Sequence, residues 1–478
     1  MKRAIGATAI LMILAGCAST INSEELGQPK ASSSAEAETT QAPEAAPTFE
    51  LSNTRVSSEL CKFVDETPEF KSRLSKEPFN YFPNVAVEPY FLPNTGEISI
   101  GLVFLDWADK KGTSQDVDYY TAQAEMMTRW YASVSQNKLN LNWQIGQGWN
   151  QLEGSWENYV FTDNTPGGDE ARVPREQWFV DEAVAASDDS YDYSDIDLVV
   201  FAIPRSGTLT QGPSGNSYSA DTVMTSGTQG MAYDVFEGSE RATVVRSQEG
   251  SIGNWVVSGT TFQHTDNKST AWIHWAHEMG HMLGYISHMG VPNPPSSDTY
   301  YQNTMYGVDL FADQWQVTRV VSSWTAWVAG WLDDDQVWCV DAEDITDGIF
   351  AINSFRNPEG QTKSLIIRTG QTTGLVIESR DWNAEFDFET PLSKKGFYNS
   401  VVMYSIDSSR HIADGSLMAM TPVDKREHWD EGKWPPTAFV YTDIYFHEGQ
   451  SLDFGELRIE PISLQDGVDF VRISRRSE

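Results

Sequence analysis

The segment STAWIHWAHEMGHMLG, which contains no proline, restricts the possible folds of this chain more than any other feature. Ser269 and Thr270 are residue types that cap the start of a helix, and Gly284 is the type that follows a helix end, so we predict a helix between them. On this helix His277 and His281 lie one turn apart and project from the same face, where both imidazoles can bind one metal ion. The fold must therefore leave room for an ion beside this helix.

Glu278 completes the pattern H-E-x-x-H between these histidines. Its side chain is offset from both imidazoles and can hold a water molecule that the metal binds. Zinc lowers the pKa of such a water to about 7, and the carboxylate can then take its proton and pass it to a leaving amine. The pattern predicts two zinc ligands and one general base. We favour this over two satisfied histidines on a buried helix, because the pattern rarely arises by chance.

A catalytic zinc ion needs a third protein ligand and an open fourth position. The longer pattern H-E-M-G-H-M-L-G-Y-I-S-H resembles the metzincin signature H-E-x-x-H-x-x-G-x-x-H/D, in which the residue three places after the glycine caps the metal. Here Ser287, a poor zinc ligand, has that place, and His288 follows it. We expect His288 to bind, because imidazole suits zinc and one extra residue in the turn is a small change. A ligand from elsewhere, with Asp298 and Asp309 as candidates, and a degenerate site remain open.

The segment Asn303-Thr-Met-Tyr-Gly307 resembles the tight turn that lies beneath the metal in metzincins. The resemblance implies that Met305 fills an apolar floor there without binding zinc. A core methionine at an ordinary turn is the alternative. Tyr306 receives no catalytic role, because metzincins that use a tyrosine near the metal usually place it two residues after the methionine, where this chain has Gly307.

Further segments make the resemblance closer, to the immune inhibitor A type of bacterial metalloproteases, from about residue 97 to the C-terminus. The segments that carry it are LVFLDWAD, RWYASVSQNKLNLNWQI, SSWTAWVAGWL, GLVIESRDWNAEFD and SVVMYSID. The resemblance implies a secreted zinc endopeptidase that is often stabilised by calcium. This chain departs from the family at Ser287, where the family usually has aspartate.

Residues 1–17 have the composition of a bacterial export signal. Lys2 and Arg3 precede an apolar run that is too short for the ~20 residues of a membrane-spanning helix, and Leu-Ala-Gly-Cys17 follows. This tetrapeptide resembles the lipobox, which implies cleavage before Cys17 and a lipid on its thiol; an ordinary secretory signal is the alternative. Ala18 after the cysteine favours the outer membrane or cell surface of a Gram-negative bacterium.

Residues 18–50 are rich in Ala, Ser, Thr, Glu and Pro and are predicted to form a disordered tether, followed by an ordered lead-in segment over 51–96 that packs on the domain behind it. Once Cys17 is assigned to lipid, Cys61 and Cys339 remain. Export places them in an oxidising compartment, so we predict a disulfide between them. The alternative is a latency device in which the Cys61 thiolate blocks the zinc.

Two folded domains are predicted after the lead-in segment. Residues 97–340 are expected to form an α/β catalytic domain, metzincin-like by resemblance, because strand and helix patterns alternate as β-α-β-α-β. The expected strands are 98–109, 138–152 and 198–204, and the expected helices are 118–136 and 173–187. Residues 205–265, rich in Gly and Ser, are expected to be loops or short strands. Short β-type runs over 341–478 predict an all-β sandwich.

The charge balance limits the partners of the chain. Its 68 acidic and 33 basic residues give a formal net charge of −35, which repels nucleic acid and anionic lipid. We therefore expect no nucleic-acid partner and no membrane contact beyond the anchor. A protein or peptide substrate and a monomeric state are expected.

Several acidic residues cluster near predicted strand ends and could supply oxygen ligands to calcium. They are Asp106, Asp109, Asp188, Asp189, Asp192, Asp195 and Asp197. No complete calcium-binding loop is present, so a solvated acidic face is favoured. We expect His274 to pack in its helix, and Glu378 and Arg380 to form a structural pair.

The predicted function is zinc-dependent endopeptidase, with zinc held by His277, His281 and His288 and with Glu278 as base and then acid. Two alternatives remain. One is a zinc hydrolase of cell-wall or glycan substrates, which shares the ligands and differs in its cleft. The other is a surface binding lipoprotein, with Ser287 as the trace of a decayed site.

Overall fold

The computed structural model describes residues in both of the predicted domains and in part of the lead-in segment. The described residues are 50–64, 92–159, 168–205, 209–211, 217–219, 245–258, 262–263, 269–283, 309–311, 319–355, 357, 361–381, 385–386, 400–408, 419–422, 445–465 and 467–476. The chain divides into two units, Met1–Pro47 and Thr48–Glu478, and every described element belongs to the second. The predicted signal with Cys17 and the tether up to residue 49 lie outside the described residues.

A four-stranded parallel sheet forms the centre of the α/β region, in the strand order β2-β1-β3-β8. Its strands are β1 (Gly96–Trp107), β2 (Leu139–Leu152), β3 (Leu198–Ala202) and β8 (Trp255–Ser258). The helices of this region are α2 (Ser114–Val134), α3 (Gly168–Ser187) and α4 (Trp272–Met282). The predicted alternation of strands and helices is confirmed, and the chain has a mixed α/β fold.

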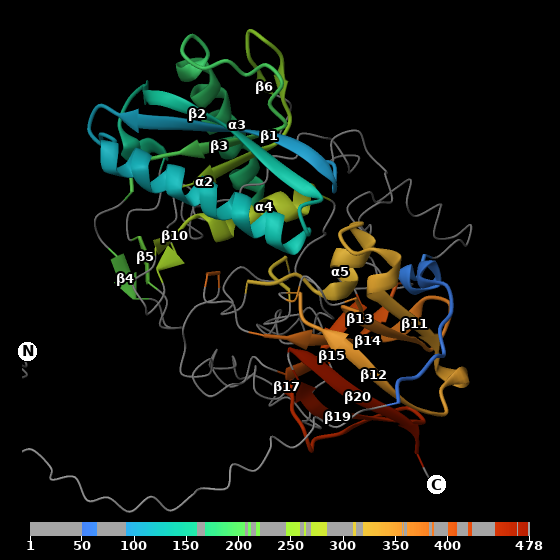
Figure 1. Cartoon of the computed structure of the whole chain (residues 1–478). Helices are drawn as coiled ribbons and strands as arrows, with labels where there is room; N and C mark the ends of the chain where they lie inside the picture. Colours follow the sequence, from blue (N-terminus) through green and yellow to red (C-terminus); the bar gives the residue numbers. More distant parts are fainter. Residues whose placement is uncertain are drawn as a thin grey trace, which may run out of the picture. The chain divides into compact units, whose positions relative to one another are not determined.

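Strand β1 is buried on both faces, because successive side chains of a strand point to opposite sides of the sheet. Ile98, Ile100 and Leu102 belong to the core that contains α2 and α4. Val103 and Leu105 belong to the core that contains α3. The sheet is therefore a middle layer with α2 and α4 on one face and α3 on the other (Figure 1). This explains why the β1 sequence is apolar almost throughout.

The boundaries of α2 follow from local chemistry. Thr113 Oγ1 accepts the N–H of Asp116 at 3.2 Å, and the Asp116 carboxylate accepts the N–H of Thr113 at 3.0 Å, which closes a capping box. After the helix, Gln136 and Asn137 have φ angles of 53° and 61°. This left-handed turn reverses the direction of the chain between α2 and β2. Strand β2 therefore runs parallel to β1.

The C-terminal region contains two β-sheets. One has the strands β11 (Val337–Asp341), β13 (Ser364–Arg368), β14 (Thr373–Arg380), β15 (Ser400–Asp407), β16 (Ala419–Pro422) and β17 (Tyr445–Phe446). The other has β12 (Asp347–Asn353), β18 (Leu452–Phe454), β19 (Leu457–Gln465) and β20 (Val468–Arg475). Leu365, Ile377 and Met403 of the first sheet share one core with Ile459 and Val471 of the second. The two sheets thus pack face to face, in the sandwich form that the sequence predicts.

Short elements complete the described structure. The short strands are β4 (Leu209–Gln211), β5 (Ser217–Ser219), β6 (Val245–Arg246), β7 (Ser251–Ile252), β9 (Phe262–Gln263) and β10 (Ser269–Thr270). The short helices are η1 (Ser58–Lys62), η3 (Trp156–Tyr159), α5 (Ser323–Val328), η4 (Asp334–Gln336) and η5 (Ala342–Asp344). The described part of 205–265 thus consists of short strands and connections, as expected.

The lead-in segment packs only partly as predicted. Of its described residues, 51–64 run along the sandwich: the N–H of Ser52 bonds the Ile349 carbonyl at 2.8 Å, and the N–H of Val56 bonds the Cys339 carbonyl at 2.8 Å. We expected the segment to pack on the α/β region, and its last described residues do so: the N–H of Leu92 bonds the Met282 carbonyl of α4 at 2.8 Å, and Leu92 is buried in the core that contains α2 and α4. Local composition does not reveal that β11, nearly 280 residues away, offers a free strand edge. The predicted domain boundary at 340/341 falls inside β11, and residues 65–91 lie outside the described residues.

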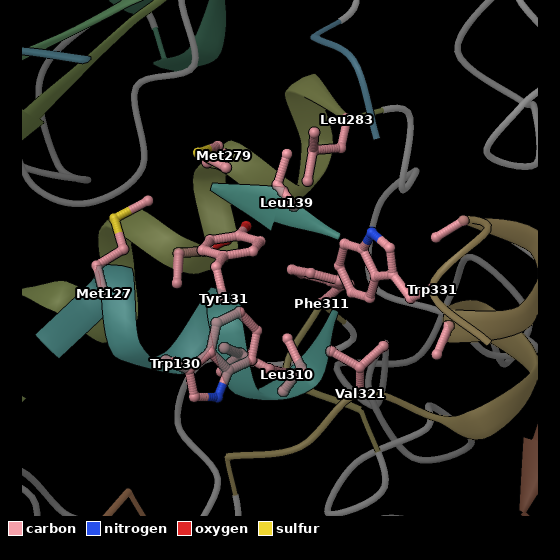
Figure 2. Packing of buried hydrophobic residues seen from close by; sticks show 14 of the residues in the cluster. Met127, Trp130, Tyr131, Leu139, Met279, Leu283, Leu310, Phe311, Val321 and Trp331 are labelled. Atoms are coloured by element: carbon pink, nitrogen blue, oxygen red, sulfur yellow. The ribbon is translucent and has the colours of Figure 1, made fainter. Parts of the chain in front are cut away.

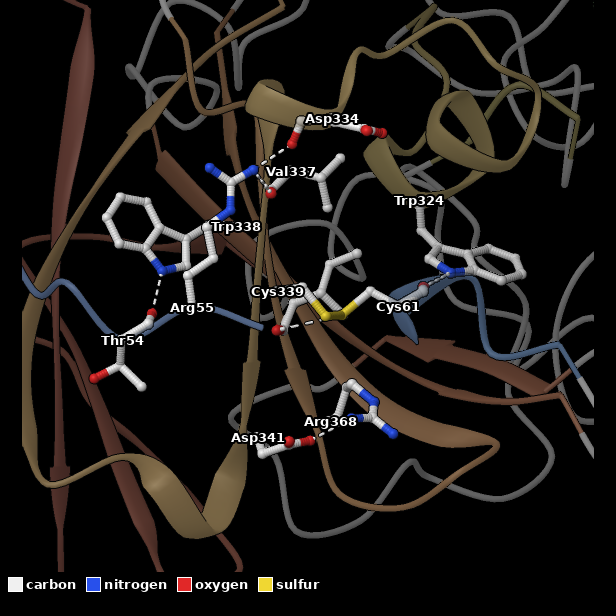
Figure 3. The surroundings of a disulfide bond; sticks show 11 residues. Thr54, Arg55, Cys61, Trp324, Asp334, Val337, Trp338, Cys339, Asp341 and Arg368 are labelled. Carbon is white, nitrogen blue, oxygen red and sulfur yellow. Dashed lines mark hydrogen bonds and ion pairs between the residues drawn. A yellow bond between two sulfur atoms is a disulfide. The ribbon is translucent and has the colours of Figure 1, made fainter. Parts of the chain in front are cut away.

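The predicted disulfide between Cys61 and Cys339 is present, and both cysteines are fully buried (Figure 3). It joins η1 to β11 across a sequence separation of 278 residues. Trp324 Nε1 donates a hydrogen bond to the Cys61 carbonyl at 2.9 Å, so α5 is fixed to the same place. Because the Cys61 sulfur is bonded to Cys339, it does not act as the zinc-blocking thiolate considered above.

A buried carboxylate lies between the two sheets of the sandwich. Asp469 of β20 is only 5 % exposed, and within the described part of the chain its Oδ2 atom accepts no hydrogen bond. Burial raises the pKa of Asp469 to about 6; Ser379 donates a hydrogen bond that opposes this rise, and the Asp381 charge adds to it. The folded protein therefore binds this proton more tightly than the unfolded chain does.

We expect Asp469→Asn to stabilise the protein at pH 8 and to have little effect at pH 4. A pKa raised on folding adds stability that is complete below pH ~4 and is lost as the pH rises through ~6, so the variant should gain about 2 kcal/mol more at pH 8 than at pH 4. Urea unfolding at the two pH values measures this difference. The exposed control Asp347→Asn should change little at either pH, and an equal effect of Asp469→Asn at both would contradict the assignment.

Candidate metal centre

Helix α4 carries His277, Glu278 and His281, and its start differs from the prediction. Ser269 and Thr270 form β10, which pairs with β9 in an antiparallel ladder, and do not cap the helix. Gln123 of α2 takes that role, because its Oε1 atom accepts the N–H groups of Ala271 and Trp272 at 2.9 and 3.2 Å. The strand pairing engages the two predicted caps, and the first helical N–H groups are satisfied from another helix.

Two further hydrogen bonds from α2 fix the surroundings of α4. Tyr131 donates its hydroxyl to the Ala276 carbonyl at 2.8 Å, and Trp130 Nε1 donates to the Arg319 carbonyl at 2.9 Å. Burial raises the pKa of Tyr131 well above its usual value, so the hydroxyl remains a donor. Figure 2 shows these two side chains packed beside Met279, Leu310 and Phe311. Neither bond is signalled by the sequence pattern, since buried aromatic residues are common on any core-facing helix face.

The polar residues of α4 lie in a hydrophobic environment. All described side chains from Ala271 to Leu283 are buried, and His277 and Glu278 are 1 % and 3 % exposed. A buried carboxylate beside a buried imidazole is costly unless both are paired or bind an ion. His277 and Glu278, the two buried polar residues of this pair, are the residues for which the sequence predicts metal binding and base catalysis.

The ring of His277 is oriented by a main-chain carbonyl. Its Nδ1 atom lies 2.8 Å from the Leu310 carbonyl oxygen. A carbonyl only accepts hydrogen bonds, so Nδ1 carries the proton and Nε2 keeps its lone pair. Histidines that bind metals are typically held in this way by a second partner. The donor set at His277 thus fits a zinc ion bound through Nε2.

His274 lies next to the predicted general base. Its Nδ1 atom is 3.4 Å from Oε1 of Glu278, one turn along the helix, and the His274 ring is 1 % exposed. We expected His274 only to pack in the helix. It does pack there, and it also contacts the carboxylate, which limits the orientations available to Glu278.

Gly280 of the H-E-M-G-H segment makes room for an aromatic ring. A Cβ atom at this position would lie 2.2 Å from Cδ1 and 2.3 Å from Cε1 of Phe311. Phe311 follows Leu310, whose carbonyl orients His277, so the close packing of this ring on α4 brings that carbonyl to the histidine. The glycine therefore has a packing role that its place in the motif does not reveal.

We expect Gly280→Ala to destabilise the protein by about 1–3 kcal/mol, because the added methyl group displaces the Phe311 ring or shifts the helix. Thermal and urea unfolding measure the loss. The double variant Gly280→Ala/Phe311→Leu should recover part of it, since the smaller side chain can move aside. A Gly280→Ala protein as stable as the wild type would contradict this packing.

The other predicted site residues are placed only in part. His281 lies in the last turn of α4, but its side chain is outside the described residues, as are Ser287, His288, Asp298 and Met305. Among the described side chains, no three from His, Cys, Asp and Glu come together to hold an ion. All the proposed zinc ligands, His277 included, stay predictions.

Asp309 is buried and engaged with the main chain. Its Oδ1 atom accepts the N–H of Phe311 at 2.9 Å, and its Oδ2 atom accepts the N–H of Ser322 at 2.8 Å. Burial raises the pKa of Asp309, while these two N–H groups and the charge of Arg380 oppose the rise. The arrangement favours a structural role over that of a third zinc ligand.

The acidic residues considered for calcium mostly brace loops. Asp106 accepts the N–H of Gly112 at 3.2 Å, and Asp109 accepts the N–H of Trp156 at 3.1 Å. Hydrogen bonds from Ser155 and Trp156 lower the pKa of Asp109. Similar contacts join Asp188 to Gln248, Asp192 to Ser194 and Asp197 to Ser99. These contacts account for the clusters without an ion.

Neither a protein-family model nor a curated protein sequence matches this chain. Among the described residues, no helix combines the length and apolar character needed to cross a bilayer. The interpretation of the site therefore depends on the chemistry of its own residues.

Proposed function

We propose that this chain is an exported zinc-dependent endopeptidase, similar to the metzincins and, within them, to the immune inhibitor A type. The observation that carries the proposal is the 2.8 Å contact of His277 Nδ1 with the Leu310 carbonyl. It leaves Nε2 as an electron-pair donor on a buried helix, one residue before a buried carboxylate. Glu278 follows this donor directly, at the place of the general base in the pattern H-E-x-x-H.

The remaining ligands in this proposal are His281, one helical turn after His277, and His288. A zinc ion bound by three imidazoles would supply a Lewis acid that lowers the pKa of its water and polarises the scissile carbonyl. Met305 is proposed to lie beneath the ion without binding it. Calcium is proposed as a second, stabilising ion only through the family resemblance.

Glu278 acts as the proton carrier. Its carboxylate takes a proton from the attacking water, so that the water oxygen can form its bond to the peptide carbonyl carbon. The same oxygen atom of Glu278 then gives the proton to the departing amine as the C–N bond breaks. The surrounding apolar side chains exclude bulk water, and His274 at 3.4 Å restricts where the carboxylate can turn.

Export and anchoring through Cys17 at the outer membrane or cell surface complete the proposal, with a monomeric enzyme that acts on proteins or peptides. Metal analysis and a peptide-library digest of the full chain, with and without calcium, test it. We expect one zinc ion per chain and chelator-sensitive cleavage. Zinc without peptide cleavage would favour a hydrolase of cell-wall or glycan substrates, and protein without zinc would favour a binding lipoprotein.

A further inference from the structure

One buried carboxylate joins residues 309–311, which orient His277, to the start of α5. Asp309 bonds the N–H of Phe311 on one side and the N–H of Ser322 on the other, at 2.9 and 2.8 Å. The N–H of Leu310 also bonds the Val320 carbonyl at 2.8 Å. These contacts fix the peptide group whose carbonyl oxygen reaches His277. The exposed fraction of Asp309 is 0 %, so water does not compete for its oxygens.

The contacts continue into the first turn of α5. Ser322 is the N-cap of this helix, and the next two N–H groups are accepted from the sandwich: Ser323 by Glu378 at 2.6 Å, and Trp324 by the hydroxyl of Tyr404 at 3.1 Å. Each of these three consecutive N–H groups therefore has an oxygen acceptor from a different element. The first turn of α5 joins residues 309–311 to strands β14 and β15.

The acceptors in the sandwich form a connected group. Tyr404 donates its hydroxyl to Glu378 at 3.0 Å, and Arg380 forms an ion pair with the same carboxylate, as its sequence predicts. The charge of Arg380 also acts on Asp309. Burial raises the pKa of Tyr404 well above its usual value, and the Glu378 charge adds to this rise, so the phenol keeps its proton.

We infer that Asp309 is a positioning residue for the proposed zinc ligand His277, and that Glu378 and Tyr404 of the sandwich support it through the first turn of α5. This inference depends on the proposed function, because it assigns a partner to the same metal site. Asp309 touches neither metal nor substrate and acts by holding the Leu310 carbonyl on Nδ1. In this inference the sandwich supports the metal site through the hydrogen bonds of Glu378 and Tyr404 to α5.

Zinc affinity of the full chain tests the inference, with zinc ion competed against a chromophoric chelator. Asp309→Asn keeps the shape of the side chain but replaces one acceptor oxygen with a donor, and we expect zinc to bind about 10- to 100-fold more weakly. The matched control is Asp106→Asn, another buried carboxylate that accepts a backbone N–H in a loop. It should bind zinc as the wild type does.

Two measurements keep the inference testable if Asp309→Asn does not fold. Tyr404→Phe removes one hydroxyl and should weaken zinc binding by about 2- to 10-fold, the effect of one lost hydrogen bond. Nitrogen NMR of metal-free wild type should show the proton of His277 on Nδ1. Zinc affinity unchanged in the variants, or a proton on Nε2, would overturn the inference. A wild type that binds no zinc refutes the proposed function, and the NMR result then decides only whether the Leu310 carbonyl holds the His277 proton on Nδ1.

Discussion

The Glu278→Gln variant should lose peptide hydrolysis by about 10²- to 10⁴-fold in kcat while it keeps one zinc ion per chain. An amide has nearly the same shape as the carboxylate but cannot take a proton from the attacking water. Glu278 is buried and takes no part in the contact of His277 with the Leu310 carbonyl. The substitution therefore leaves that contact in place. Initial rates on a library-selected peptide, together with metal analysis, measure both quantities.

Glu125→Gln is the matched control, since Glu125 is exposed on α2 and has no role in the proposed site. It should cleave at the wild-type rate. If Glu278→Gln cleaves peptide as fast as this control, the assignment of the base is wrong. If it instead loses its zinc along with its activity, Glu278 contributes to metal binding and the division of roles on α4 must change.

Removal of the disulfide by the double variant Cys61→Ser/Cys339→Ser should destabilise the folded protein by about 2–5 kcal/mol. The bond closes a loop with a sequence separation of 278 residues, and long loops gain most in the chain-entropy description of cross-links. Hydrogen bonds of residues 52 and 56 to the sandwich also weaken when their covalent attachment is lost. Urea unfolding of the wild type and the double variant, without reductant, gives the difference in the free energy of unfolding.

Reduction provides an independent control for this prediction. Wild-type protein unfolded under reducing conditions should match the double variant, whereas the variant itself should be insensitive to reductant. Equal stability of oxidised wild type and double variant would show that the noncovalent contacts of the lead-in segment hold it unaided.

The sequence predicts the secondary structure of the α/β region well, for a physical reason. The continuous apolar run of β1 indicates a strand that is buried on both faces, and the two core clusters meet on its opposite sides. The Glu378–Arg380 pair and the disulfide were also predictable, because charge and oxidation limit the partners of such residues. The path of residues 50–64 was not, since it depends on a distant strand edge.

The sequence names candidate zinc ligands and a candidate base, which stay predictions, but it does not reveal the contacts that support them. H-E-x-x-H names His277 and Glu278, yet the partner of His277 is a main-chain carbonyl 33 residues away, and any residue type carries such a carbonyl. The cap from Gln123 likewise replaces two better-placed local candidates. Interactions with backbone groups leave no signature in composition, and the motif does not reveal that Gly280 makes room for Phe311 either.

The attachment of the lead-in segment determines how the molecule responds to pulling. Tension applied to the chain before residue 50 passes through η1 and is taken up at Cys61, where the covalent bond transfers it to β11. The load therefore reaches the sandwich at the disulfide before it can reach the parallel sheet. A chain held at its N-terminus would bear the pull through its sandwich, and the sheet beside α4 would be spared.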